Sequence, residues 1–221
     1  MRETVLKKMD KCSGCGLCEI VCPVHAVKMR YNKKGFLYPT IQKEKCINCG
    51  LCEKRCPVEN ISVAYPITCY AGVNLNPKTK EKSSSGGMFA ALAEYILEHG
   101  GVVFGAAIVP KGNIVTVKHT MIKDKAELKI LQGSKYVQSD ARECYPLVKQ
   151  QLLDGKKVLF SGTPCQVSAI KSYLENEYEN LLLVDLICHG TPSTLHWEES
   201  LQEKIISGER ISEVSFRGPD G

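Results

Sequence analysis

The sequence has no apolar run long enough to cross a membrane and no signal-peptide core at its start. Its first twelve residues, MRETVLKKMDKC, contain no hydrophobic region, and the longest apolar stretches reach about nine residues, whereas a transmembrane helix needs about 20. Aromatic residues are also scarce, at 7% with a single Trp, and none are interleaved with the basic residues. We therefore expect a cytoplasmic protein with no membrane span and no nucleic-acid partner.

Cysteine, by contrast, is abundant, and eight of the 12 cysteines form one pattern written twice. The two copies are CSGCGLCEIVCP at 12–23 and CINCGLCEKRCP at 46–57. Three cysteines with two residues between neighbours can hold one 4Fe-4S cluster, while the fourth cysteine of the run serves the other cluster. We assign one cluster to Cys12, Cys15, Cys18 and Cys56, and its twin to Cys46, Cys49, Cys52 and Cys22. Gly14, Gly16 and Gly50 suit positive φ angles in these loops.

Other uses of these cysteines fit less well. Structural zinc takes two separated pairs of ligands rather than two runs of four. A disulfide framework belongs to small secreted chains. A thiol-redox protein using Cys165 and Cys188 is disfavoured, because no Cys-x-x-Cys motif lies outside the cluster loops.

The charge is uneven along the chain. Residues 1–58 carry a net charge of +7 and the remainder a net of −2. Much of this basicity offsets the negative charge of the clusters. The remaining basicity could steer an acidic electron carrier toward a set of lysines: Lys7, Lys8, Lys11, Lys33, Lys34, Lys43 and Lys45.

The fold class that we expect is an α+β ferredoxin-like module followed by an α/β domain with a mixed sheet. The segment between the cysteine repeats predicts a hairpin turning at Asn32 to Gly35, and a two-cluster domain over 1–62 should depend on its clusters for a core. A strand and polar linker follow at 63–82, with the strand over 67–75, and an α/β flavin-binding domain occupies 83–221.

Helices and strands alternate in that second domain. Strands are predicted at 102–109, 114–122, 157–162, 181–190 and 211–217. Helices are predicted at 88–101, 124–132, 141–155, 164–177 and 193–208. This alternation indicates a largely parallel or mixed sheet.

Four loops are candidates for binding a ligand, and the weakest of them is the loop at 133–136, which places a cation, a hydroxyl and an aromatic ring within four residues. Turns after the strands at 157–162 and 181–190 suit ligand binding at the carboxyl edge of a sheet, although well-made strand-to-helix turns would look the same. The serine and glycine run at 83–87 suits a phosphate or flavin edge, with a flexible linker as the alternative. The candidate flavin residues are Ser84, Ser85, Gly86, Gly87, Ser134, Lys135, Tyr136, Gly162, Thr163 and Gln166.

The other cysteines and histidines offer weaker signals. Cys69 in an apolar strand and Cys144 on a helix face are expected in the core. The histidines at 25, 99, 119 and 196 have no partner spacing and are expected at surface or half-buried positions.

The doubled cluster motif followed by SSSGGMFAAL, GSKYVQS, FSGTPCQVSAIK and DLICHGTPS resembles the beta-subunit family of coenzyme F420 hydrogenases and dehydrogenases. This resemblance runs from Cys12 to about Phe216 and implies an enzyme that binds FAD and iron–sulfur clusters. It also implies that Cys165 and Cys188 ligate a third 4Fe-4S cluster in a full-length protein. Family members usually continue beyond the point where this sequence stops, so we expect the chain to be C-terminally truncated.

We therefore expect the protein to be an iron–sulfur flavoprotein oxidoreductase. Electrons pass between its clusters and a flavin, which is coupled to a soluble two-electron carrier or substrate, an F420-type deazaflavin coenzyme by resemblance. Its redox partner would be a ferredoxin or a hydrogenase or dehydrogenase subunit. The alternative is a non-catalytic electron-transfer subunit that docks a separate catalytic protein.

Overall fold

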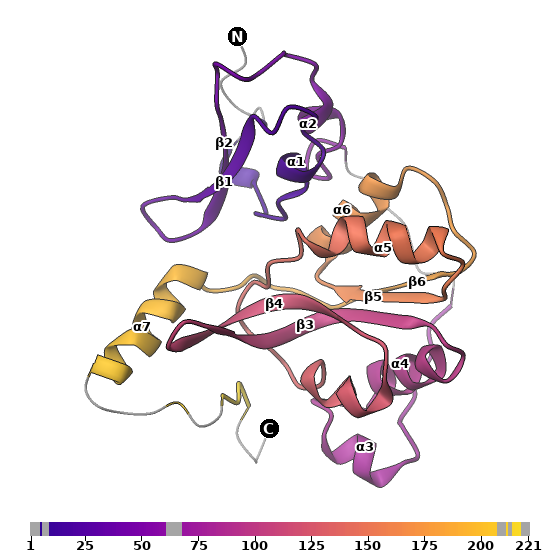
Figure 1. Cartoon of the computed structure of the whole chain (residues 1–221). Coiled ribbons are helices and arrows are strands. Elements are labelled where there is room, and N and C mark those ends of the chain that lie inside the picture. Colours follow the sequence, from indigo (N-terminus) through magenta and orange to yellow (C-terminus); the bar gives the residue numbers. More distant parts are fainter. Residues whose placement is uncertain (1–4, 6–8, 61–67, 207–210, 212–213, 218–221) are drawn as a thin grey trace.

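The computed structural model describes residues 5, 9–60, 68–206, 211 and 214–217. They form two parts, a small N-terminal module and an α/β domain, with the module packed on one helical layer of the domain (Figure 1). This arrangement matches the predicted fold class, an N-terminal ferredoxin-like module followed by a mixed α/β domain.

The N-terminal module has short elements joined by cysteine loops. Its elements are η1 (Met9–Lys11), α1 (Leu17–Ile20), β1 (Val27–Tyr31), β2 (Leu37–Ile41) and α2 (Leu51–Lys54). The strands β1 and β2 pair antiparallel, and the Gly35 amide donates to the Asn32 carbonyl at 2.9 Å, which confirms the predicted hairpin. Cysteines supply half of the module's small buried cluster, in which Cys18, Cys22 and Cys56 accompany residues such as Val27.

The α/β domain is built on a four-stranded sheet in the order β4-β3-β5-β6. The strands are β3 (Val102–Lys111), β4 (Ile114–Ile122), β5 (Val158–Gly162) and β6 (Leu181–Asp185). β3 and β4 form an antiparallel hairpin, while β3, β5 and β6 run parallel. The sheet is therefore mixed, as predicted.

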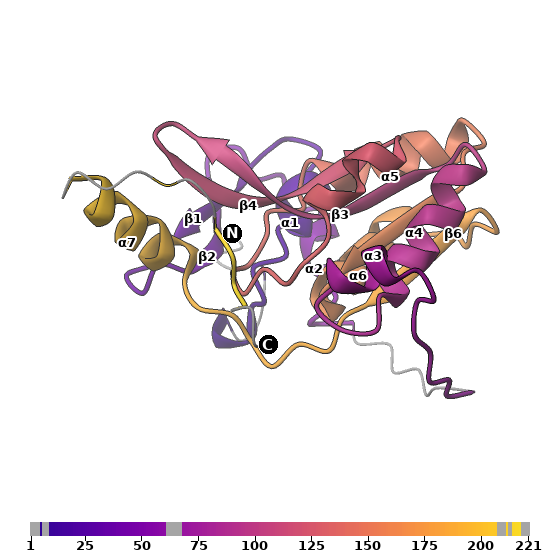
Figure 2. The same ribbon diagram turned by 90° about the horizontal axis from the view of Figure 1, so that it is seen from below.

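Helices cover both faces of the sheet (Figure 2). Alternating strand residues point to opposite faces, so Phe104 and Phe160 pack with α5 (Cys144–Leu153) and α6 (Pro164–Leu174). Val103 and Leu159 pack on the other face with α4 (Met88–Glu98) and the short 3-10 helix η2 (Lys125–Ile130). The sheet thus has two separate apolar cores.

α7 (Thr194–Ile206) packs against β4 rather than over the middle of the sheet. Its Glu198 is buried at 5% exposure and accepts hydrogen bonds from Lys111 Nζ at 2.5 Å and Thr116 Oγ1 at 2.6 Å. The partners supply the positive charge and the donor that a buried carboxylate requires.

Several local predictions are wrong. Residues 68–75 contain no strand, and Cys69 is exposed, because no neighbouring strand pairs with this segment; residues 63–67 lie outside the described part of the chain. The polar linker contains α3 (Pro77–Glu81), which begins where the Asn76 side chain accepts from the amides of Lys78 and Thr79. The predicted helix at 124–132 is the 3-10 helix η2. The described part of 211–217 is not a strand, and residues 212–213 lie outside the description.

Candidate functional site

The second cysteine set lines one small cavity in the N-terminal module. Cys46, Cys49 and Cys52 come from the second cysteine loop, and Cys22 comes from the end of the first. Cys49 is exposed, and Ile47 beside it has 61% of its surface open to solvent. This grouping joins the four cysteines that the sequence assigns to the second cluster.

The first cysteine set lies deeper. Burial raises the pKa of the Cys15 thiol to about 12, and the charges of Cys165, Cys56 and Cys12 add to this rise. Burial likewise raises the pKa of Cys18, with further contributions from Cys15, Cys12 and Cys56. Four thiols held this close together lose their protons readily only when a cation or cluster compensates their charge.

The two cysteine loops fit a metal cluster in their backbone as well as in their thiols. Gly14, Gly16 and Gly50 have φ angles of 69°, 75° and 73°, as predicted. The Gly14 amide donates to Cys12 Sγ at 3.4 Å and the Ala26 amide to Cys22 Sγ at 3.2 Å, contacts that stabilise thiolate charge. Among the described residues, no three Cys, His, Asp or Glu side chains converge as ligands of a single metal ion.

The hydroxyl of Ser13 gives an independent sign that a bound group is expected in the first loop. Ser13 Oγ is buried and has no hydrogen-bond partner among the described residues. A buried hydroxyl without a partner is costly. A cluster sulfur next to Cys12 would accept a hydrogen bond from this hydroxyl, so the residues present fit a 4Fe-4S cluster here.

The α/β domain holds this first loop through hydrogen bonds. Gln138 Nε2 donates to the Ser13 carbonyl at 2.7 Å, and Tyr145 Oη donates to the Cys15 carbonyl at 2.9 Å. Arg142 pairs with Glu19 of α1 and with Asp140 of its own domain. The charged hydrogen bond to Asp140 is the main reason that the pKa of Arg142 is raised. Sequence reasoning did not identify Gln138, Arg142 or Tyr145, because their spacing carries no recognisable motif.

A cavity of about 620 Å³ lies between this loop and the α/β domain. It is lined by residues from all the predicted ligand loops and by Cys12 and Ser13 of the first cysteine loop. The predicted residues that line it are Ser84, Ser85, Gly86, Gly87, Ser134, Lys135, Gly162, Thr163, Cys165, Gln166 and Cys188. Tyr136 is not among the lining residues and is 48% exposed.

The turn from β5 into α6 has the geometry that its sequence predicts. Thr163 is the N-cap and Pro164 the first helical residue, and the Thr163 amide donates to Gln166 Oε1 at 3.0 Å in a capping box. Thr163 Oγ1 lies 3.2 Å from Cys165 Sγ. The side chain of Gln166 is therefore fixed at the floor of the cavity.

His119 continues this hydrogen-bond chain and is 6% exposed, so the surface or half-buried position predicted for it is wrong. Its Nε2 lies 2.9 Å from the Ser161 carbonyl and therefore carries the proton, so its Nδ1 accepts from Ser139 Oγ at 2.8 Å. Gln166 Nε2 in turn donates to Ser139 Oγ at 3.1 Å. Burial lowers the pKa of His119 to about 4, so the ring is neutral. His119 lies on β4 opposite Ala106 of β3, and the sequence does not reveal that pairing.

Two segments close the side of the cavity formed by the 83–87 loop. The Asn74 amide donates to the Gly86 carbonyl at 2.7 Å, and a Cβ on Gly86 would lie 2.8 Å from the Gly72 carbonyl oxygen. Arg217 bridges two loops, donating from Nε to Tyr136 Oη at 2.9 Å and from Nη1 to the Ser84 carbonyl. That hydrogen bond from Arg217, followed by one from Ser134, lowers the pKa of Tyr136.

The remaining cysteines divide between site and core. Cys165 and Cys188 line the same cavity, and Cys165 lies close enough to Cys12 and Cys15 for its charge to raise the pKa of both thiols. The Gly190 amide donates to the exposed Cys188 Sγ at 3.4 Å. Cys144 is 2% exposed in the core of the α/β domain, which confirms the prediction.

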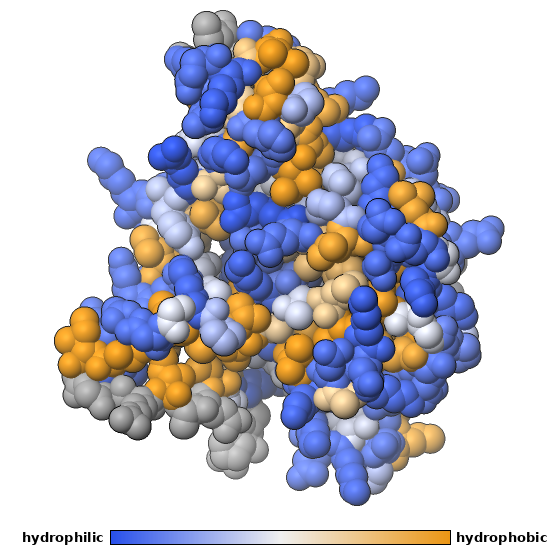
Figure 3. Space-filling view, in the orientation of Figure 1, coloured by the Kyte–Doolittle hydropathy of each residue, from blue (hydrophilic) through white to orange (hydrophobic). Residues whose placement is uncertain are grey.

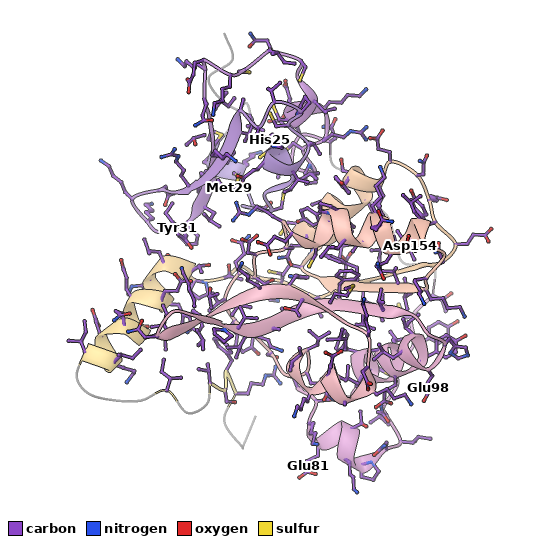
Figure 4. All side chains as sticks on the ribbon, viewed as in Figure 1. His25, Met29, Tyr31, Glu81, Glu98 and Asp154 are labelled. Atoms are coloured by element: carbon purple, nitrogen blue, oxygen red, sulfur yellow. The ribbon has the colours of Figure 1, made fainter. Side chains whose placement is uncertain are left out.

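The surface of the protein sets these sites in context. His25 lies on the N-terminal module, Asp154 lies at the end of α5 in the helical layer next to the module, and Glu98 lies at the end of α4 on the other side of the sheet (Figure 4). A hydrophobic strip runs over the module on the face shown in Figure 3, within a largely hydrophilic surface. No described helix is long and apolar enough to span a membrane.

Comparison with known proteins agrees with this geometry. A 4Fe-4S dicluster domain matches residues 11–60, and the N-terminal and C-terminal parts of the coenzyme F420 hydrogenase/dehydrogenase beta subunit match residues 69–143 and 155–220. No curated protein matches the sequence.

Among solved structures, the chain is similar to one in a xenon derivative of the F420-reducing [NiFe] hydrogenase complex from Methanosarcina barkeri, with 20% identity and a TM-score of 0.46. The match covers 60% of this chain and 46% of that one, so this chain matches about half of the relative's length. Because the two parts of the beta-subunit family together match more than half of the chain and follow the dicluster domain, the chain belongs to the coenzyme F420 hydrogenase/dehydrogenase beta-subunit family of oxidoreductases and carries a 4Fe-4S dicluster domain.

Proposed function

We propose that the protein is an iron–sulfur flavoprotein oxidoreductase that relays electrons between its N-terminal clusters and a flavin, FAD by family resemblance, in the 620 Å³ cavity. The observation that carries this proposal is the shared wall. Cys12 and Ser13 of the first cysteine loop line the same cavity as the Ser84–Gly87 and Gly162–Gln166 loops. A ligand in the cavity would therefore lie against the first cluster.

The residues of the chain would divide this work by domain. Residues 1–62 would hold the two clusters, residues 63–82 would join the parts, and residues 83–221 would bind the flavin. Bound clusters supply one-electron transfer, and a bound flavin converts single electrons into the pairs that hydride chemistry needs. Gln138 and Tyr145 would position the cluster loop, while Gln166 and Ser139 would fix the cavity wall.

The different solvent exposure of the two cysteine sets supports an order for the electron carriers. Cys49 of the second set is open to solvent, whereas Cys15 of the first set packs against the core of the α/β domain and Cys18 is buried within the module. A redox partner protein, such as a ferredoxin or a hydrogenase or dehydrogenase subunit, would exchange electrons at the second cluster. The soluble two-electron carrier, an F420-type deazaflavin coenzyme by resemblance, would exchange them at the cavity.

Cys165 and Cys188 keep their proposed role as ligands of a third 4Fe-4S cluster in a longer protein. Both line the cavity and each sits beside a strand-to-helix turn. The proximity of Cys165 to Cys12 and Cys15 would place such a cluster next to the first. Iron analysis of a longer version of the protein tests this, since a third cluster adds about four irons to about eight.

The flavin is tested by replacing Gly86 with Val in protein that carries its clusters. The new side chain would collide with the Gly72 carbonyl, so we expect flavin affinity to fall at least about tenfold while iron content is unchanged. Gly112→Asn is the control for changing a glycine away from the cavity, because an added Cβ there has nothing within 4 Å and Asn tolerates its φ of 62°. Equilibrium dialysis under nitrogen measures the flavin affinity of both variants, and iron analysis measures their cluster content.

Failure of the native protein to bind FAD or FMN at micromolar concentrations would contradict the flavoprotein proposal. The chain would then be a non-catalytic electron-transfer subunit that docks a separate catalytic protein. Visible spectra distinguish the flavoprotein from the electron-transfer subunit, because clusters alone give a broad band at about 400 nm and a flavin adds its own bands.

A further inference from the structure

Lys135 is the one Lys, Arg, Asp or Glu among the described residues that line the cavity. No Asp or Glu is among those lining residues, and His119 is neutral because burial lowers its pKa to about 4. The other polar groups are hydroxyls, amides and thiols. Apart from the charge of a cluster held at Cys12, the side chains that line the cavity therefore carry one positive charge and no carboxylate to balance it.

The ammonium group of Lys135 is held by the end of η2. Its Nζ donates to the carbonyls of Gln132 at 2.7 Å and Ile130 at 3.2 Å, which leaves one of its three donors. No described carboxylate forms an ion pair with it. Burial lowers its pKa to about 8, so it remains a cation at neutral pH. A partly desolvated cation at a cavity wall is stabilised by a bound anion.

The loop that carries Lys135 is joined to the 83–87 loop. Arg217 donates to Tyr136 Oη on one side and to the Ser84 carbonyl on the other. The Phe216 ring packs edge-on against Tyr136, with centroids 6.2 Å apart, and this second contact supports the bridge. The bridge ties the loop that carries Lys135 to the 83–87 loop, and both loops line the same cavity.

We propose that Lys135 binds a phosphate group of the cavity ligand and thereby sets the ligand's orientation. The phosphate lies at Lys135 and the 83–87 loop, and the redox-active ring lies at the wall formed by Cys12 and Ser13. This inference rests on the proposed flavin function and adds to it the residue that selects a phosphorylated flavin over an unphosphorylated one.

The test compares FMN with riboflavin, which lacks the phosphate, in native protein and in Lys135→Met, both with clusters loaded. We expect the variant to bind FMN about tenfold or more weakly, as loss of a charged hydrogen bond predicts, while its riboflavin affinity stays as in the native protein. Lys135→Arg should restore most of the FMN affinity. Lys129→Met, at an exposed position in the 3-10 helix whose end holds Lys135, is the control and should change neither affinity.

Each other outcome counts against the inference in a distinct way. Equal weakening of FMN and riboflavin in Lys135→Met would show that the lysine only supports the end of η2. Unchanged FMN affinity would show that the phosphate lies elsewhere, with the flavin function still standing. Absence of binding by either flavin to native protein would overturn the flavin function together with the inference.

Discussion

The two cysteine loops have nearly the same sequence and very different surroundings. Leu17, in the first loop, is 1% exposed and belongs to the core of the α/β domain, whereas its counterpart Leu51 lines only the small cavity of the second set. Ser13 is held against the large cavity by Gln138, whereas its counterpart Ile47 is 61% exposed. One loop is thus part of an interface and the other is open to solvent.

The difference shows that a repeated motif determines which metal is held but not what each copy does. Both loops need a residue with positive φ just before their second cysteine. Gly14 with φ 69° and Asn48 with φ 56° supply it. The residues that distinguish the copies, Gln138, Arg142 and Tyr145, come from the other domain. We therefore expect the first cluster to serve the cavity and the second to serve an external partner.

The largest expected effect concerns which cysteine completes which cluster. Cys22→Ala should remove the cluster of Cys46, Cys49 and Cys52, and Cys56→Ala the cluster of Cys12, Cys15 and Cys18, with about four of eight irons lost in each case. Iron analysis and electron paramagnetic resonance identify the surviving cluster. If each variant lost the cluster nearest to it in sequence, the crossed assignment would be wrong.

Replacing the matched leucines should separate the two loops next. Leu17→Ala removes a fully buried side chain from the core of the α/β domain and should lower the free energy of unfolding by about 3 kcal/mol. Leu51→Ala, at a half-buried position, should lower it by about 1 kcal/mol. Urea unfolding under nitrogen, followed by circular dichroism, measures both, and equal losses would contradict the asymmetry.

The wall that faces the first loop should respond to acid through His119. Because the unfolded histidine takes up its proton near its ordinary pKa of 6.5 and the folded one only near about 4, stability falls as pH drops through that interval. Between pH 7 and pH 5 the loss from this group is about 2 kcal/mol. His119→Gln should unfold with a correspondingly smaller pH dependence in the same urea assay. A variant with the native pH dependence would show that other groups cause it.

The smallest effect is on reduction potential. Tyr145 Oη directs its proton at the Cys15 carbonyl, and this positive end stabilises the more negative, reduced state of the adjacent cluster. Tyr145→Phe should lower the potential of the first cluster by something on the order of tens of millivolts. The second cluster is the internal control in the same redox titration. Equal shifts of both would indicate a general loosening of the module.

Local patterns were enough to predict most of the fold. Antiparallel β4, for example, has the predicted bounds Ile114–Ile122 because it is apolar and flanked by turns. The segment 68–75 is also apolar, yet it forms no strand, since a strand requires a partner that sequence does not supply. Helix α3 was missed because the Asn76 cap and Pro77 occur within a run of polar residues.

The candidate site was predictable only where it consists of contiguous motifs. The loops at 83–87, 133–135 and 162–166 were identified from glycines, serines and turn chemistry, and all line one cavity. The chain from Gln166 through Ser139 to His119 was not, because its members lie 20 or more residues apart and meet only after the sheet forms. For the same reason nothing in the cysteine repeats indicated which copy would face the cavity.

The most direct test of the account is which cluster lies beside the cavity ligand. A one-electron-reduced FMN radical bound in the cavity relaxes faster when a paramagnetic cluster is near, and power saturation in electron paramagnetic resonance measures this. We predict that the enhancement survives in Cys46→Ala, which removes the second cluster, and is largely lost in Cys18→Ala, which removes the first. Loss in Cys46→Ala with retention in Cys18→Ala would contradict the central claim.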